Sequence, residues 1–390
     1  MSGDTVRQRI TVSWEFPVVF TRNLFSPANL VLAETLDRLG ENRRHRAIVF
    51  IDAQVLAAHP QLPAKVQAYF AAHGERIEML AEPQIAPGGE PAKNDFALVE
   101  GFMRLLLDRH LDRQSFVLII GGGAVLDSVG LAAALVHRGV RQVRIPTTVL
   151  GQNDAGVGVK NGVNFVGGKN AIGTFAPPFA VLNDFDFLLT LSDRDWLCGV
   201  AEAFKVSIIR DRPFFDELLA NASLYPQRDF AAMQHLVRRC AEIHLDHIRE
   251  NGDPFEFGRA RPLDFGHWSA HKLELLSGFR ISHGEAVATG VLLDSFYAAK
   301  QGWLSSGELA LICEGFSESG FRLWFAELDA QDAEGQRAIF GGLRDFQEHL
   351  GGELTVTFPN GLGARQEVHE IDLALMEGAI EELRTFSSAR

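Results

Sequence analysis

Short apolar runs and helix-spaced apolar residues alternate along the first half of the chain. Residues 47–51 and 116–120 are β-rich apolar runs. The second run leads through the glycines 121–123 into apolar positions between Val125 and Val136 that have the period of a helix. Residues 140–145 then return to a strand pattern. A strand, a helix and a strand in this order predict a parallel sheet with a crossover connection.

The second half has a different pattern, with long helix-spaced stretches and few strand signals from about residue 186. A short β-rich run at 354–358 is interpreted as an isolated strand. The pattern predicts an α/β, Rossmann-like nucleotide-binding domain over residues 1–185. A mostly α-helical domain over residues 186–390 would face it across a cleft, and the histidine and lysine motifs described below make it a candidate metal- and substrate-binding domain. The clearest helical stretches are 195–209, 231–250, 266–277 and 284–300.

The acidic balance of the chain excludes some classes of partner. Its 390 residues carry a formal net charge of −13, whereas binding to nucleic acid or anionic membranes needs a cationic surface. Cys198, Cys240 and Cys313 are odd in number and widely spaced, which fits a reducing compartment and not a disulfide framework. No signal segment is visible, and no apolar stretch reaches the roughly 20 residues that cross a bilayer. We expect a cytoplasmic protein with a small-molecule substrate and no nucleic-acid or membrane partner.

The glycine-rich turn after residue 120 indicates a phosphate-binding element. Backbone N–H groups at Gly122 and Gly123 can approach a pyrophosphate closely, and the following helix N-terminus adds partial positive charge. The order differs from the usual GxGxxG, so a tight turn without a ligand is the alternative. Asp52, which ends an earlier strand, either accepts hydrogen bonds from an adenosine ribose or caps the next helix.

Three histidines and an acidic residue indicate a metal site. His267 and His271 are four residues apart and share one helix face, and His283 follows. Imidazoles bind divalent metals, and Glu202 supplies a carboxylate upstream. A carboxylate with two of these histidines leaves a coordination position open, as a catalytic zinc requires. The spacing alone is also common on solvated helices.

The stretch 146–175 places Lys160 and Lys169 among glycines and asparagines. With Arg138 before it and Lys205 after it, this stretch predicts a cationic pocket inside an acidic chain. Such a pocket suits a phosphate. Ordinary surface lysines on a glycine-rich loop are the alternative.

Taken together, these motifs resemble those of the sugar phosphate cyclases, of which 3-dehydroquinate synthase is the best-known member. The matching blocks follow one another in the family's order over most of residues 90–295. The signatures are Gly121-Gly122-Gly123-x-x-x-Asp127, Arg138-Gly139-Val140-Arg141, Pro146-Thr147-Thr148, Asp154-x-x-x-x-x-Lys160, Gly168-Lys169-Asn170, Ala201-Glu202-x-x-Lys205, Gly266-His267-x-x-x-His271 and His283-Gly284-Glu285-Ala286-Val287.

The resemblance implies a homodimer with NAD in the N-terminal half and zinc or cobalt in the cleft. By position, the metal ligands would be Glu202, His267 and His283. Arg138 would reach the substrate phosphate from the neighbouring subunit. The residues around the sugar phosphate would be Asp154, Lys160, Lys169, Asn170, Lys205, Asp264 and His271. The residues in contact with NAD would be Asp52, Glu90, Lys93, Gly122, Gly123, Asp127, Thr147, Thr148, Asp154, Lys169, Phe187, Thr190 and Leu191.

The implied activity is that of an NAD- and metal-dependent carbon–oxygen lyase. The substrate alcohol is oxidised transiently, phosphate is eliminated, the hydride returns, and an intramolecular aldol addition closes a carbocycle. No net redox change occurs.

The chain departs from the 3-dehydroquinate synthase pattern where that enzyme holds a substrate carboxylate. His244 stands at the position of a lysine, Ala260 at that of an arginine and Asp264 at that of an asparagine. Asp264 would repel a carboxylate within about 4 Å by about 1–4 kcal/mol, yet aspartate accepts hydrogen bonds from hydroxyls well. The pattern therefore favours a substrate with a neutral, hydroxyl-bearing end. The resemblance to the cyclases of sedoheptulose 7-phosphate then implies that sugar phosphate as substrate and a valiolone-type cyclitol as product.

Several residues could restore the missing cations, and the sequence leaves their contact with substrate open. An apparent two-residue insertion brings in Arg259 and Arg261. His349 stands near a missing C-terminal lysine, and His244 is itself a candidate.

The sequence is also compatible with three other functions. A 3-dehydroquinate synthase with a rearranged carboxylate site is the first. A metal-dependent polyol or alcohol dehydrogenase is the second, although simple alcohol oxidation needs no lysine-rich phosphate pocket. A scaffolding homologue without catalysis is the third, and the complete set of proposed metal ligands argues against it.

Overall fold

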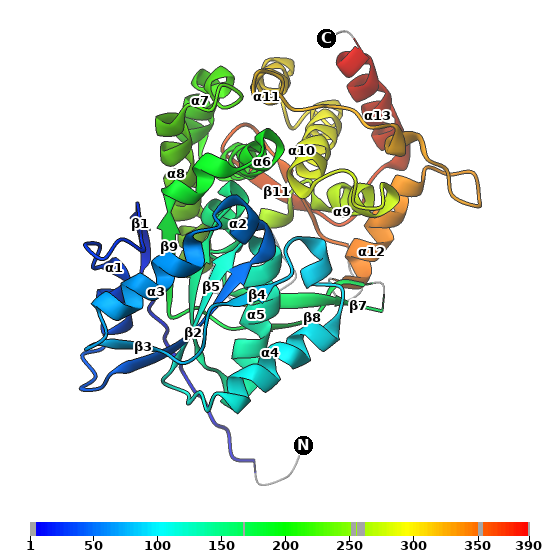
Figure 1. Cartoon of the computed structure of the whole chain (residues 1–390). Helices are drawn as coiled ribbons and strands as arrows, with labels where there is room; N and C mark the ends of the chain where they lie inside the picture. Colours follow the sequence, from blue (N-terminus) through cyan, green and yellow to red (C-terminus); the bar gives the residue numbers. More distant parts are fainter. Residues whose placement is uncertain (1–4, 167, 251–254, 256–261, 350–353, 389–390) are drawn as a thin grey trace.

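The computed structural model describes residues 5–166, 168–250, 255, 262–349 and 354–388. Strands concentrate in the N-terminal half and helices in the C-terminal half, which lies above the sheet in Figure 1. The last strand of the main sheet ends at Asp184. The domain boundary at residue 185 stays a prediction.

The N-terminal half is built on a seven-stranded sheet in which every pairing is parallel. This confirms the predicted crossover topology, and the three predicted strands are present within two residues of their expected ends. The strands in spatial order are β1 (Val18–Thr21), β9 (Ala180–Asp184), β6 (Arg141–Pro146), β5 (Phe116–Gly121), β2 (His45–Asp52) and β3 (Ile77–Met79), with β4 (Gln84–Ala86) also paired to β2.

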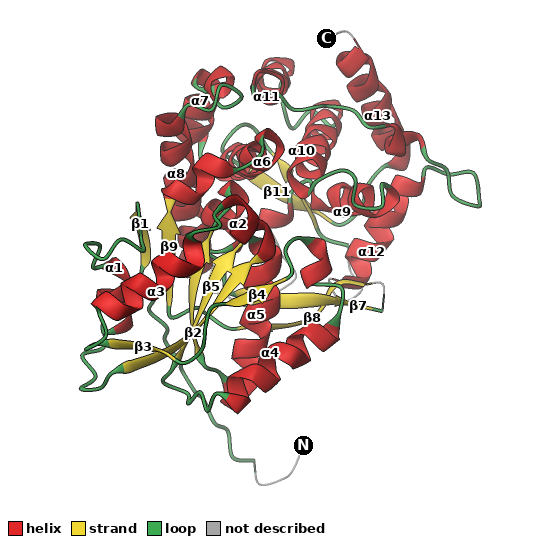
Figure 2. Ribbon diagram, viewed as in Figure 1, coloured by secondary structure: helices red, strands yellow, loops and turns green. Residues whose placement is uncertain are grey.

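Both faces of the sheet are buried, which explains the continuous apolar runs in its central strands. Val49 and Leu118 face one core with helices α1 (Val31–Leu36) and α3 (Leu62–Ala72). Ile48 and Ile119 face a second core, which is covered by α4 (Phe96–Asp108) and α5 (Gly123–Leu135). A short helix, α2 (Ala53–Ala58), follows β2. Figure 2 shows these red helices around the yellow sheet.

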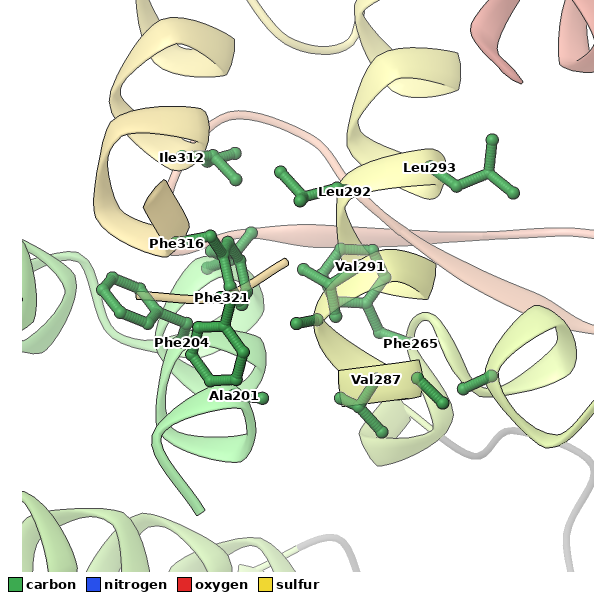
Figure 3. Packing of buried hydrophobic residues seen from close by; sticks show 14 of the residues in the cluster. Ala201, Phe204, Phe265, Val287, Val291, Leu292, Leu293, Ile312, Phe316 and Phe321 are labelled. Carbon is green, nitrogen blue, oxygen red and sulfur yellow. The ribbon is translucent and has the colours of Figure 1, made fainter. Parts of the chain in front are cut away.

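The C-terminal half is mostly helical, and the four predicted stretches are confirmed. Phe204, Val291 and Phe316 bring three of its helices, α6, α10 and α11, into one core, which Figure 3 shows from close by. Among the described helices, none combines the length and apolar character needed to cross a bilayer. The helices are α6 (Asp193–Arg210), α7 (Arg212–Ala220), α8 (Phe230–Glu250), α9 (His267–Leu276), α10 (His283–Lys300), α11 (Ser306–Glu318), α12 (Gly341–His349) and α13 (Leu373–Ser388).

Two small antiparallel sheets differ from the expectations. The strand predicted as isolated is β10 (Val356–Pro359), and it pairs with β11 (Arg365–Val368), so that interpretation is wrong. The lysine-rich stretch folds into a hairpin of β7 (Lys160–Phe165) and β8 (Gly168–Phe175). The sequence did not predict these strands because of their glycine content. The hairpin packs against α5 and so places its lysines beside the main sheet.

Candidate active site

Close helix contacts bring the proposed metal ligands together. Gly266 has a left-handed φ of 77°, and a Cβ there would lie 2.7 Å from the Val291 nitrogen, so α9 begins directly against α10. A Cβ at Gly284 would lie 2.4 Å from Cys198 Cα, so α10 begins directly against α6. Glycine at both positions lets His267 and His283, the first residues of α9 and α10, approach Glu202 on α6.

The beginning of α10 is fixed by its own sequence. Ser282 caps the helix, and its backbone N–H donates to the Glu285 carboxylate, which completes a capping box. His283 therefore occupies the first helical position with its ring directed at the neighbouring helices.

The three proposed ligands form a compact group. Their ligand atoms all lie within 4.8 Å of one another. Glu202 Oε1 lies 3.7 Å from His267 Nε2 and 3.5 Å from His283 Nε2. Two donors bound tetrahedrally to zinc lie about 3.4 Å apart. Among the described residues, the fully buried Glu202 Oε1 has no hydrogen-bond partner. The residues therefore fit a divalent cation between these atoms.

Hydrogen bonds at the other ring nitrogens orient both histidines. His267 Nδ1 lies 3.1 Å from the Phe265 carbonyl oxygen, so it donates there and directs its Nε2 lone pair at Glu202. His283 Nδ1 lies 3.4 Å from Glu274 Oε2. Burial and Lys205 lower the pKa of His267 to about 4. Burial opposes protonation of His283, but Glu274 and Glu202 prevail and raise its pKa to about 9.

A buried ion network surrounds this group. Lys205 Nζ lies 2.5 Å from Glu202 Oε2. Asp154 lies on a π-helical turn, η3 (Gly151–Ala155), and its Oδ1 is 3.0 Å from His244 Nδ1. Burial favours neutral Lys205, but Glu202 and Asp154, with Asp264, outweigh it and raise the Lys205 pKa. Lys205 is therefore a charged group at pH 7.

The β7–β8 hairpin carries the other proposed substrate residues. Lys160 and Asn170 are exposed, whereas Lys169 Nζ lies 2.7 Å from Glu274 Oε2 on α9. His271 follows His267 by one turn, with their rings 5.3 Å apart. Burial and the charge of Lys169 hold the pKa of His271 well below its usual range, so this imidazole is neutral.

Some predicted residues are not brought to this group. Arg138 is exposed in η2 (Val136–Arg138), after α5 has run about 20 Å toward the opposite edge of the sheet. Within one chain, Arg138 therefore does not join the lysines in a single cationic pocket. Ala260, Arg259 and Arg261 lie outside the described residues, as does the side chain of His349.

The proposed NAD residues gather at the carboxyl edge of the sheet, where ligands bind in open α/β folds. Within this set, Lys93 Nζ pairs with Asp127 at 2.6 Å, and Glu90 accepts from Asn164 at 2.6 Å. Thr190 contacts His59 at 2.7 Å. The positions at or just after strand ends are Asp52 as the last residue of β2, Gly122 and Gly123 after β5, Thr147 and Thr148 after β6, and Phe187, Thr190 and Leu191 in or just after η4 (Phe185–Thr190).

Gly122 fits a close approach by a ligand better than a packing requirement, whereas a Cβ at Gly121 would lie only 3.0 Å from the Cβ atoms of Asp52 and Val125. Gly122 caps α5 without a side-chain hydrogen bond, so the first N–H groups of the helix stay available. A Cβ at Gly122 would meet only Thr148 Cγ2, at an ordinary 3.5 Å. Asp52 accepts from the Gln54 nitrogen at 2.8 Å and so caps α2. Its contact with a ribose stays a prediction.

Sequence reasoning missed two residues of the site, Glu274 and Arg144, and the partner of a third, His244. Glu274 lies seven residues after His267 on the same helix face, a spacing that could have drawn attention to it. The pairing of His244 with Asp154 carries no local signal. Arg144 is a fully buried cation that donates to the carbonyl oxygens of Gly156, Gly158 and Lys160, and so anchors the segment between Asp154 and the hairpin.

Comparisons with known proteins agree with this geometry. Residues 84–198 match the 3-dehydroquinate synthase N-terminal family model, and residues 199–336 match the C-terminal one. A 3-dehydroquinate synthase of Shewanella loihica is 31% identical over 350 residues, covering 90% of this chain and 94% of the relative.

Two solved structures of cyclases also resemble the chain. The 2-epi-5-epi-valiolone synthase of Streptomyces hygroscopicus, with NAD+ and Zn2+ bound, matches with a TM-score of 0.85 and 30% identity over 97% of this chain and 99% of the other. A 2-deoxy-scyllo-inosose synthase with NAD+ and Co2+ matches with a TM-score of 0.75 and 19% identity over 94% and 96%, which supports the fold alone. The chain belongs to the 3-dehydroquinate synthase family, within the sugar phosphate cyclases.

Proposed function

We propose that this sugar phosphate cyclase converts sedoheptulose 7-phosphate into a valiolone-type cyclitol with release of phosphate. The observation that carries the proposal is the concentration of negative charge around Lys205. Glu202, Asp154 and Asp264 all act on this one buried ammonium group. In this group Glu202 would bind the metal and Asp154 pairs with His244, so Asp264 is the carboxylate that would repel a substrate carboxylate placed beside it.

The histidine at the family's lysine position supports the same conclusion. His244 is committed to Asp154 at 3.0 Å and is not a free cation for a substrate carboxylate. Asp264, in η6 (Pro262–Asp264), can instead accept hydrogen bonds from hydroxyl groups. A neutral, hydroxyl-bearing end of the substrate therefore suits this side of the site.

The cofactors that the proposal requires have residues to hold them. Glu202, His267 and His283 would bind zinc or cobalt, and the uncapped start of α5 would bind the pyrophosphate of NAD. When bound, the metal supplies a Lewis acid for a secondary alcohol and NAD supplies reversible hydride uptake, so elimination and aldol closure proceed without net redox change.

The remaining residues would orient the sugar phosphate and move protons. Neutral His271 can form a hydrogen bond with a substrate hydroxyl group, and charged Lys205 can stabilise developing negative charge. Lys160, Lys169 and Asn170 lie on one hairpin, where they can bind the phosphate. Arg138 would complete that contact from a second copy of the chain in a homodimer.

The test is a phosphate-release assay on the purified chain with NAD and Zn2+ or Co2+. We expect phosphate from sedoheptulose 7-phosphate, a cyclic product by mass spectrometry, and no accumulation of NADH. Phosphate release only from the seven-carbon sugar acid phosphate would overturn the proposal and favour a 3-dehydroquinate synthase, the activity for which the Shewanella relative is named. Steady NADH production from a simple polyol would instead indicate a dehydrogenase.

A further inference from the structure

Glu274 is a buried carboxylate beside the proposed metal ligands to which the reaction described above gives no role. It lies on α9 with 5% of its surface exposed. Its Oε2 is 3.4 Å from His283 Nδ1 on α10 and 2.7 Å from Lys169 Nζ on β8. A single oxygen atom therefore contacts a proposed metal ligand and a proposed substrate lysine.

The contact with His283 bears on metal binding. The Nε2 atom of His283 faces Glu202 at 3.5 Å, and it can bind a cation only while its lone pair is free. A carboxylate that accepts the Nδ1 proton holds the ring in that tautomer, fixes its orientation and strengthens the nitrogen as a donor.

The two histidines of the site differ in this respect. His267 donates its Nδ1 proton to the neutral carbonyl of Phe265, at 3.1 Å. His283 has a carboxylate in the same role. A negatively charged acceptor draws more electron density toward the far nitrogen than a carbonyl does, so His283 should depend more strongly on its partner.

The contact with Lys169 crosses from one half of the molecule to the other. Lys169 and Glu274 are 105 residues apart in the chain, and their side chains are 19% and 6% exposed. Their ion pair ties the β7–β8 hairpin to the helix that carries His267. A substitution of Lys169 should therefore change the contact between Glu274 and His283, because both partners use the same oxygen of Glu274.

We propose that Glu274 is a positioning residue that orients His283 for metal binding and couples the metal centre to Lys169. The inference rests on the proposed metal site, but its test does not depend on turnover. A different assignment is that Glu274 is itself a ligand, because His271, Glu274 and His283 also bring donor atoms within 4.8 Å of one another.

The experiment measures Co2+ binding to the chelator-stripped full chain, using competition for affinity and the visible spectrum for ligand geometry. Glu274→Gln keeps an acceptor without charge, and we expect Co2+ to bind about 10- to 100-fold more weakly, with the ligand number unchanged in the spectrum. Glu274→Asp keeps the charge at a greater distance, so its Co2+ affinity should fall between those of the wild type and Glu274→Gln. This second variant still tests the inference if Glu274→Gln folds poorly. Glu217→Gln removes the carboxylate of an exposed pair with His235 and should leave the affinity unchanged.

A double-mutant cycle tests the coupling. The effect of Lys169→Met on Co2+ affinity should change at least about threefold when Glu274 is already Gln. Equal affinities for the wild type and both Glu274 variants would overturn the inference. A visible spectrum of Glu274→Gln that indicates one ligand fewer would also overturn it. Failure of the wild-type chain to bind Co2+, or unchanged binding by Glu202→Gln, would instead overturn the metal site itself.

Discussion

The two halves of the molecule build their parts of the site by different physical means. At the carboxyl edge of the sheet, most of the proposed NAD contacts lie at or just after strand ends, and the proposed pyrophosphate site consists of backbone N–H groups at the start of α5. In the helical half, the site is a set of buried or partly buried ionisable side chains from α6, α9 and α10. A ligand bound by backbone N–H groups needs room to approach them, whereas a buried charged side chain needs an opposite charge or a hydrogen-bond partner. Substitutions should therefore have different consequences in the two halves.

The largest effect is expected in the helical half, at Glu202. Glu202→Gln removes the carboxylate that lies between His267 and His283. We expect Co2+ affinity to fall on the order of a thousandfold and phosphate release to fall with it, because a three-ligand site loses its only anionic ligand. Metal competition and turnover assays measure both. Tight binding of one Co2+ by the variant would contradict the assignment.

A backbone site should respond to added volume without loss of stability. In Gly122→Ala, the φ of −74° suits alanine, and the new Cβ meets only Thr148 at 3.5 Å. We expect NAD to bind about 100-fold more weakly, while the thermal midpoint changes little. Calorimetric titration and thermal unfolding measure the two quantities. Gly101→Ala on α4 meets no neighbour within 4 Å and serves as the control. NAD affinity equal to that of the control would show that the turn does not contact the cofactor.

A buried neutral histidine in the helical half, His247, should make the folded chain less stable in acid. Burial, with Arg210 and other nearby cations, lowers the pKa of His247 to about 3. Between that value and the ordinary pKa near 6.5, only the unfolded chain takes up the proton, so stability is lost as the pH falls below about 6.5. His247→Gln should remove about 2 kcal/mol of this loss at pH 5. Urea unfolding of both proteins at pH 7 and pH 5 gives the difference, and a stability gap that is the same at both pH values would refute it.

The smallest predicted effect concerns substrate choice. Asp264→Asn removes one of the three carboxylates that act on Lys205. The relative kcat/KM for the carboxylated sugar phosphate over sedoheptulose 7-phosphate should rise about fivefold, equivalent to about 1 kcal/mol of relieved repulsion. Phosphate release from each substrate gives the ratio. An unchanged ratio would show that Asp264 does not face the substrate end that distinguishes them.

The same contrast explains what could be predicted from the sequence. The sheet, the glycine turn and the helical half could be predicted from the apolar pattern, because strands buried on both faces appear in the sequence as continuous apolar runs. The β7–β8 hairpin did not follow, since its strands contain glycine and asparagine at buried positions such as Asn161 and Gly162. Strand β11 has only partly buried or exposed residues, so β10 looked isolated.

The site was predictable only as far as its motifs were local or resembled a known family. His267 and His271 are one helical turn apart, and that spacing is visible in the sequence. Two of the ion pairs that organise the site, Asp154 with His244 and Lys169 with Glu274, join residues 90 or more positions apart. A glutamate on a helix is ordinarily solvated, whereas Glu274 is buried where α10 packs against α9 and Lys169 of the β7–β8 hairpin contacts its carboxylate.

The metal position itself gives the most direct test of the account. Crystals of the chain grown with NAD and Co2+ would be measured at the cobalt absorption edge. We predict one anomalous peak about 2.0–2.2 Å from a Glu202 oxygen and from the Nε2 atoms of His267 and His283, with Glu274 outside coordination distance. No peak at these atoms, or a peak between His271, Glu274 and the Nδ1 side of His283, would contradict it.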